Sequence, residues 1–148
     1  MGEANAAIRI RAGVVVVNNN RVLLVRQNNH PFWVLPGGTL ELGETLPTCA
    51  VRELEEELKL TITLQKLLGM GEFIPPTDPI KGQRHVVDTV WLATADTDVL
   101  TVTTDENLND ARWFGLNELD AIDLKPDWIY QLILDGAPEF SGGAGYFS

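Results

Sequence analysis

Apolar positions in the N-terminal part of the chain follow the spacing of β-strands. The run from Ile8 to Val17 alternates at first, then becomes continuously apolar, and is rich in β-branched side chains. Three asparagines, Asn18 to Asn20, separate it from a second apolar run at Arg21 to Gln27. β-branched runs on either side of turn-forming residues predict a hairpin whose strands lie inside a sheet.

The period changes after a polar, proline-containing stretch at Asn28 to Pro36, which predicts a loop that enters a short strand. Gly37 and Gly38 allow a tight backbone turn at that point. From Thr45 to Lys59 the apolar residues recur with helical spacing, and Pro47 falls in the first turn, where proline is tolerated. This segment predicts a helix.

The second half of the chain predicts further strands, two short helices and a loose tail. In chain order we expect one or two strands interrupted at Gly69 and Gly71 (Thr61–Ile74), a loop (Pro75–Gln83), a strand (Arg84–Ala95), an acidic loop (Asp105–Asp110), a strand (Arg112–Phe114), two helices (Leu116–Ala121 and Pro126–Leu134) and a tail (137–148). No internal repeat divides the chain, so we expect a single domain over residues 1–148.

The composition is that of an ordinary globular chain, 45% hydrophobic with a mean hydropathy near zero. No apolar run is long enough to cross a membrane, and the N-terminus lacks the pattern of a secretory signal. A single cysteine, Cys49, excludes an internal disulfide. These features favour a cytoplasmic location.

The formal net charge is −10. Such an excess of negative charge argues against nonspecific binding to a nucleic acid polymer or to an anionic membrane. Much of the acidity is expected to lie on the surface, where it aids solubility. Where several carboxylates gather, however, they recruit divalent cations that reverse the sign of the charge locally.

The predicted helix contains such a gathering. Glu53, Glu56 and Glu57 follow at i, i+3 and i+4 and therefore share one face, next to an apolar arc that includes Leu54 and Leu58. Like charges one turn apart repel, and burial beside a core would raise their pKa values. Hard divalent cations prefer oxygen ligands of this kind, so the face predicts a metal site.

The order of residues around this helix narrows the interpretation. Gly38 is followed after five residues by Glu44 and after seven more by Arg52-Glu53-Leu54-Glu55-Glu56-Glu57. This arrangement resembles the Nudix box, G-x5-E-x7-R-E-U-x-E-E-x-G-U, in which U is aliphatic. Every fixed position matches except position 59, where Lys59 replaces a glycine that would cap the helix. The flanking segments Trp33–Gly38 and Ala111–Phe114 also resemble the family.

The resemblance implies a fold and an activity. The fold would be an α/β/α sandwich, an α/β class with a mixed, curved sheet between helices. Family members hydrolyse the pyrophosphate linkage of a nucleoside diphosphate linked to another moiety, such as a nucleotide, ADP-ribose or a sugar. Homodimers are common among relatives, but nothing in the sequence identifies the edge that would pair.

The resemblance also implies a metal site and roles for the box residues. Two or more Mg²⁺ or Mn²⁺ ions would be held by Glu53, Glu56 and Glu57. A glycine carbonyl of the Gly37-Gly38 turn, which we assign to Gly38, would complete the site. Many members add a glutamate from the region of the acidic loop, for which Glu106 is the candidate.

Catalytic roles follow in the same way. Glu53 would deprotonate water, although the base varies between branches of the family. Arg52 reaches Glu56 at i+4 and would orient the carboxylates. Glu44 would support the geometry between loop and helix.

Four residues outside the box are candidates for contacting substrate. Arg26 follows an apolar strand, and Arg84 and His85 follow the long loop, where specificity commonly resides. Trp33 offers a ring for stacking on a nucleobase, but anchoring its strand to the core is the more common use of such a residue. A solvent-facing arginine and a hydrogen-bonded histidine at a strand start are the corresponding structural alternatives.

Several functions remain open within and beyond this interpretation. A nucleoside triphosphate sanitiser, an ADP-ribose or sugar-nucleotide pyrophosphatase and a dinucleoside polyphosphate hydrolase share the box, and the long loop favours diphosphate-linked substrates. A catalytically silent, nucleotide-binding regulatory module would be expected to lack box carboxylates, and none is missing. An isomerase of the same superfamily needs a cysteine outside the helix, whereas Cys49 lies inside it.

Overall fold

The computed structural model describes residues 8–75, 84–102 and 107–136. The strands are β1 (Arg9–Asn18), β2 (Arg21–Gln27), β3 (Gly37–Thr39), β4 (Ile62–Phe73), β5 (Val86–Ala95) and β6 (Leu108–Gly115). The helices are α2 (Leu46–Leu58), the 3-10 helix η2 (Leu116–Ala121) and α3 (Ile129–Gly136). None of the described helices is long and apolar enough to cross a membrane.

The strands form one mixed sheet in the order β4-β5-β1-β2-β6, with β3 paired to β1. β1 runs parallel to β5, and every other pair is antiparallel. The predicted hairpin between β1 and β2 is confirmed. Asn19 and Asn20 form its turn with φ values of 51° and 63°, which asparagine tolerates better than most residues.

The two hairpin strands separate soon after their turn. Only Val17 and Asn18 of β1 pair with β2, at Val22 and Arg21. The segment 34–39 lies between the strands beyond that point. Its residue Val34 bridges to Val25 of β2, and β3 then pairs with the N-terminal half of β1. This segment carries the Gly37-Gly38 turn into the middle of the sheet.

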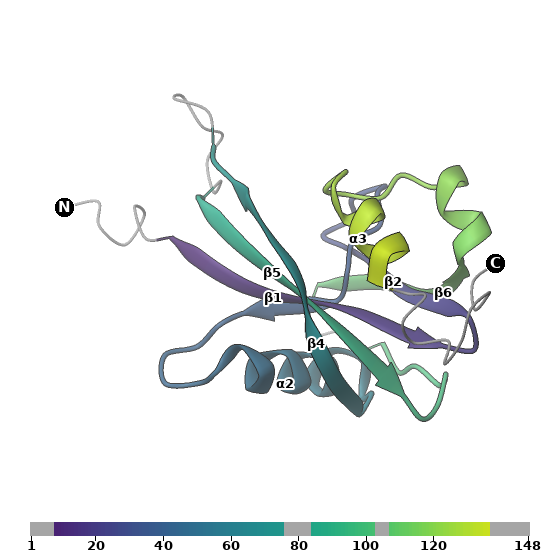
Figure 1. Cartoon of the computed structure of the whole chain (residues 1–148), viewed down its shortest axis with the longest axis horizontal. Helices are drawn as coiled ribbons and strands as arrows, with labels where there is room; N and C mark the ends of the chain where they lie inside the picture. Colours follow the sequence, from purple (N-terminus) through teal and green to yellow (C-terminus); the bar gives the residue numbers. More distant parts are fainter. Residues whose placement is uncertain (1–7, 76–83, 103–106, 137–148) are drawn as a thin grey trace.

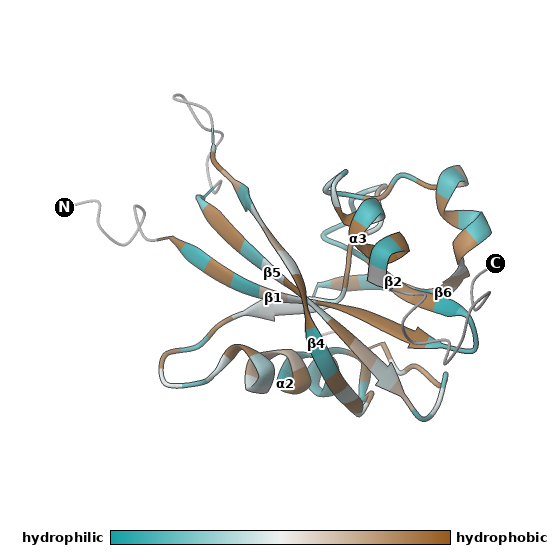
Figure 2. Ribbon diagram, viewed as in Figure 1, coloured by the Kyte–Doolittle hydropathy of each residue, from teal (hydrophilic) through white to brown (hydrophobic). Residues whose placement is uncertain are grey.

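Helices cover both faces of the sheet, which confirms the predicted α/β sandwich (Figure 1). On one face α2 buries Cys49, Ala50, Leu54 and Leu58 against alternate residues of β1 and β2. On the other face α3 and η2 bury Ile129, Ile133 and Leu119. Figure 2 shows the C-terminal half of β1 as apolar and α2 as banded by polar and apolar residues.

The structure differs from the sequence prediction in three places. β4 is one continuous strand, which Gly69 and Gly71 do not interrupt. Its pairing with β5 is irregular at two positions. A Cβ atom at Gly71 would lie 2.2 Å from the Trp128 ring, so this glycine makes room for the segment before α3. α3 begins at Ile129 instead of Pro126, and the helix at 116–121 has 3-10 geometry.

Candidate active site

Both ends of α2 are defined by particular residues. Thr45 caps the N-terminus, and its Oγ1 accepts a hydrogen bond from the Thr48 backbone N–H at 3.2 Å. Lys59 ends the helix in the left-handed conformation, with φ 51° and ψ 39°, and its backbone N–H donates to the Glu55 carbonyl. A non-glycine residue pays roughly 1–2 kcal/mol for this conformation. Lys59 therefore adopts the left-handed conformation expected of the glycine at this position of the box, at a cost in stability.

The turn at β3 meets α2 in very close contact. A Cβ atom on Gly38 would lie 2.1 Å from the Glu53 carboxyl carbon, so any side chain there would displace the Glu53 carboxylate. Gly37, at φ 149°, is more tightly constrained, because a Cβ there would lie 2.0 Å from the Ala12 carbonyl oxygen, which belongs to the backbone. The two glycines thus bring the backbone of β3 against the box carboxylates.

Arg52 is the centre of an ion-pair network on α2. Its guanidinium donates to Glu44 at 2.6 and 3.0 Å, to Glu53 at 3.0 Å and to Glu56 at 3.1 Å. The contact with Glu56 is the one predicted from the i, i+4 spacing. Hydrogen bonding to Arg52 lowers the pKa of Glu44 from 4.5 to about 2, and the same bonds raise the pKa of Arg52. The arginine holds the loop and the helix together.

Glu57 lies in a different environment from its two neighbours. Its side chain is only 3% exposed, whereas the Glu56 side chain is 48% exposed. Its Oε1 accepts the Gly37 backbone N–H at 3.3 Å, and its Oε2 accepts the Gln27 side-chain amide at 3.2 Å. Both of these donors are neutral groups.

The three box carboxylates do not converge in this arrangement. Within the described part of the chain, no three His, Cys, Asp or Glu side chains are placed to hold a metal ion. The donor chemistry nevertheless suits one, since three carboxylates on adjacent turns supply the hard oxygens that Mg²⁺ and Mn²⁺ prefer. A cation would compete with Arg52 for Glu53 and Glu56.

Cys49 lies one turn before Glu53 and is fully buried. Burial raises the pKa of its thiol to about 11, and the sulfur lies 3.8 Å from the Gly38 carbonyl oxygen. A thiol that stays protonated is a poor nucleophile. Cys49 therefore serves as a small packed residue behind the turn.

A cleft of about 140 Å³ opens on the α3 face of the sheet, next to the end of β2. Arg11, Asp88, Lys125 and Gln27 line it with polar groups, and Leu35 and Ile129 supply apolar walls. The Arg11 guanidinium donates to Asp88 at 3.0 Å, and both side chains are partly buried. One residue of the cleft lining, Gln27, therefore also contacts a box carboxylate, Glu57.

A family model for the NUDIX domain matches residues 7–135. The chain belongs to the Nudix family. It is 33% identical over 110 residues to a protein of Methanocaldococcus jannaschii named ADP-ribose pyrophosphatase, a match that spans 71% of this chain and 60% of that one.

Two solved structures share the fold. A MutT NUDIX hydrolase from Burkholderia pseudomallei superposes with a TM-score of 0.61 at 29% identity, over 75% of this chain and 85% of that one. A C. elegans Ap4A hydrolase superposes with a TM-score of 0.73 over 91% of this chain and 99% of that one, at 20% identity, which is a likeness of fold alone.

Two of the predicted substrate residues lie on the α3 face, opposite α2. Trp33 is 5% exposed and packs edge-on against Phe114, with their ring centroids 4.9 Å apart. The Arg26 guanidinium lies 4.5 Å from the Trp33 ring centroid and forms an ion pair with Asp110 at 3.0 Å. This packing favours the anchoring role of Trp33. It also engages Arg26 in a contact within the protein.

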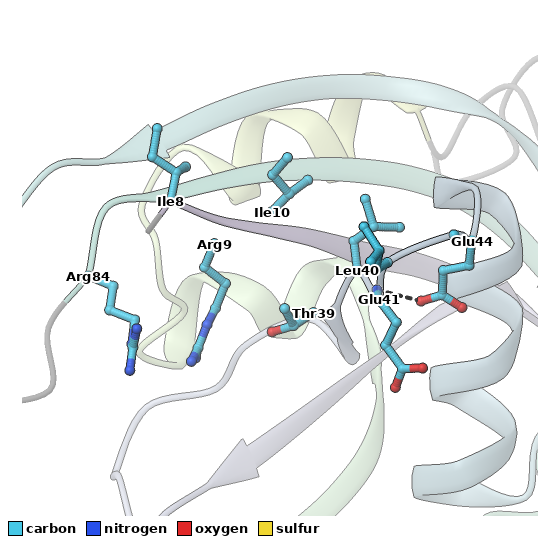
Figure 3. Close-up of a pocket in the computed structure, with 10 residues that line it drawn as sticks. Ile8, Arg9, Ile10, Thr39, Leu40, Glu41, Glu44 and Arg84 are labelled. Carbon is cyan, nitrogen blue, oxygen red and sulfur yellow. Dashed lines mark hydrogen bonds between the residues drawn. The ribbon is translucent and has the colours of Figure 1, made fainter. Parts of the chain in front are cut away.

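The other two predicted residues lie at the start of β5. Arg84 lines an open groove of about 390 Å³ together with Arg9 and the loop that contains Glu41 and Glu44. Figure 3 shows both arginines extending to one side of this groove, with Ile8 and Ile10 on the other. The His85 Nε2 lies 2.9 Å from Glu72. Glu106, the predicted additional metal ligand, lies outside the described residues.

Proposed function

We propose that this chain is a metal-dependent hydrolase that cleaves the pyrophosphate linkage of a nucleoside diphosphate linked to another moiety. One observation carries the proposal. The Gly37-Gly38 turn packs against Glu53 and donates a backbone hydrogen bond to Glu57, and all three box carboxylates are glutamates. A module that had lost its chemistry would not need this close contact.

The residues have separable roles in the proposed reaction. Divalent cations, when bound, neutralise charge on phosphate oxygens and lower the pKa of bound water. Glu53, pressed against Gly38, is the proposed base. Arg52 orients Glu53 and Glu56 by hydrogen bonds and ties them to the preceding loop through its bond to Glu44. Glu57, buried on α2 and hydrogen-bonded to Gly37 and Gln27, is the third proposed metal ligand.

The cleft supports a diphosphate-linked substrate. Arg11 and Asp88 present a donor and an acceptor side by side, which suits the hydroxyl groups of a ribose or the edge of a base. The M. jannaschii relative carries the name ADP-ribose pyrophosphatase, which points in the same direction. We therefore propose ADP-ribose-type compounds ahead of nucleoside triphosphates.

The test is a panel of substrates with purified protein and Mg²⁺ or Mn²⁺. ADP-ribose, sugar nucleotides, dinucleoside polyphosphates and nucleoside triphosphates would be compared by product release. We expect Glu53→Gln and Glu57→Gln to lower kcat by about 10²–10⁴-fold. Glu55→Gln is the matched control, because Glu55 is exposed on the same helix and accepts a hydrogen bond from the Thr61 hydroxyl, away from the other box carboxylates.

Two outcomes would contradict the proposal. Full activity in Glu53→Gln and Glu57→Gln would remove the box carboxylates from the chemistry. Tight nucleotide binding without turnover by the wild-type protein, across the panel and with either metal, would instead identify a regulatory module. Cleavage of triphosphates alone would keep the reaction class and replace the substrate.

A further inference from the structure

Gln27 lines the cleft and also contacts a box carboxylate. It is the last residue of β2, and its side-chain amide donates to Glu57 Oε2 at 3.2 Å. The cleft lining includes the same residue. No part of the Nudix box includes this residue, because it precedes Gly38 by more than ten positions.

The hydrogen bond from Gln27 is significant because Glu57 is a buried acidic residue. Among the described residues, Glu57 is the one charged side chain in the buried class. Burial of a carboxylate is costly unless its oxygens are hydrogen-bonded. The backbone N–H of Gly37 fixes one oxygen, and Gln27 fixes the other. Two donors from opposite sides leave the carboxylate little freedom to rotate.

The alternation of β2 assigns this task to Gln27. Val25 and Leu23 point to the α2 face, whereas Leu24 and Val22 point to the α3 face. Gln27 therefore follows Val25 towards α2, and Arg26 points to the α3 face, where it meets Asp110 and Trp33. The Gln27 amide on the α2 face thus fixes the orientation of one Glu57 carboxylate oxygen.

We propose that Gln27 is a positioning residue that holds the Glu57 carboxylate in the orientation that binds a divalent cation. This inference rests on the proposed function in one respect, namely that Glu57 is a metal ligand. Neutral second partners of metal-binding carboxylates characteristically set metal affinity by fixing the orientation of the ligand. Loss of the amide should therefore weaken metal binding without unfolding the chain.

The test measures Mn²⁺ binding directly, by the loss of the free-Mn²⁺ electron paramagnetic resonance signal. Gln27→Met removes the donor at nearly constant volume, and Gln27→Asn keeps an amide but withdraws it from Glu57. We expect each to raise the Kd for Mn²⁺ by about 10–100-fold. The Mn²⁺ concentration needed for half-maximal hydrolysis should rise in parallel, while kcat at saturating Mn²⁺ falls less.

Gln131→Met is the matched control. Gln131 also donates its amide to a carboxylate, Asp135 Oδ1 at 2.8 Å, but on the exposed side of α3. It should leave Mn²⁺ affinity unchanged, and the thermal midpoints of all variants would show that they are folded. Gln27→Asn decides the matter if Gln27→Met does not fold.

One result would overturn the inference. Unchanged Mn²⁺ affinity in a folded Gln27 variant would do so, and if its KM for substrate rose instead, Gln27 would act on the substrate alone. A failure of the proposed function looks different, because the wild-type protein would then bind Mn²⁺ and cleave nothing. In that case the comparison of Mn²⁺ affinities between Gln27 and Gln131 variants would still stand.

Discussion

The face of the sheet under α2 and the face under α3 are packed alike but carry charge differently. Each buries one helix surface of aliphatic residues, with Leu54 and Ile133 both fully buried. On the α2 face, Arg52 and four acidic side chains form one network at the edge of that core. On the α3 face, the partly buried ion pair Arg11–Asp88 lines a cleft.

This difference in charge separates what the fold needs for stability from what it needs for hydrolysis. The apolar halves of both faces come from the period-two alternation of β1 and β2, which needs no chemistry to form. The charged parts lie where segment 34–39 enters the sheet and brings backbone against α2. Stability should therefore depend similarly on the two faces, whereas hydrolysis should depend mostly on one.

The largest expected effect tests the likeness of the two cores. Leu54→Ala on the α2 face and Ile133→Ala on the α3 face should each lower the free energy of unfolding by about 2–5 kcal/mol, because each leaves a cavity. Urea denaturation followed by circular dichroism measures both. If one of them cost less than about 1 kcal/mol, the faces would not be packed to the same density.

The next effect separates hydrolysis from stability. Gly38→Ala should lower kcat by about 10²-fold, because its Cβ would push the Glu53 carboxylate out of place by an ångström or more. Steady-state kinetics with a substrate from the panel gives the number, and the far-ultraviolet spectrum serves as the control for folding. Unchanged kcat in folded Gly38→Ala would show that the close contact is not needed for the reaction.

A smaller effect concerns pH. Because the pKa of Glu44 is lowered from 4.5 to about 2 by Arg52, the folded state holds the charged form more tightly than the unfolded chain does. Its contribution is present above pH 4.5 and is lost as the pH falls towards 2. Thermal midpoints of wild type and Glu44→Gln should differ most above pH 4.5 and converge near pH 2.

A difference that stayed constant across this range would mean that Glu44 acts through its shape and not through its charge. The corresponding change on the α3 face, Asp120→Asn, removes the charge of the group that accepts a hydrogen bond from the Tyr130 hydroxyl at an exposed position. It should leave the hydrolysis rate unchanged, which sharpens the contrast between the faces.

The smallest signal comes from Cys49. With its pKa raised to about 11 by burial, the thiol should react with a disulfide reagent at neutral pH only as fast as α2 leaves the sheet. Absorbance of the released thiolate measures this rate, and denatured protein provides the fast reference. Immediate reaction of the native protein would show that the α2 face is open in solution.

The sequence predicted the features that depend on local periodicity, namely strands, a helix and contacts between residues one helical turn apart. The hairpin, the helix with Pro47 in its first turn, and the contact between Arg52 and Glu56 follow from local periodicity and are confirmed. The left-handed Lys59 was predictable because a glycine normally occupies that position in the box.

Contacts between distant segments were beyond this kind of prediction. The role of Gln27 was not predicted because it depends on a contact with Glu57, thirty residues later in the chain. Its charged neighbour Arg26 was chosen as the candidate instead. The alternation of β2 was the available signal, since it places Gln27 and not Arg26 on the helix-bearing face. In the same way Gly71 was expected to interrupt a strand, because nothing local shows that Trp128 packs on it.

Segment 34–39 links substrate choice to turnover. The same few residues give the cleft its Leu35 wall and place Gly38 beneath Glu53. A one-residue insertion or deletion there would exchange the faces of every side chain that follows, so Gly38 would no longer be the residue opposite Glu53. Efforts to redesign the specificity of this enzyme should therefore replace side chains within the segment and leave its length untouched.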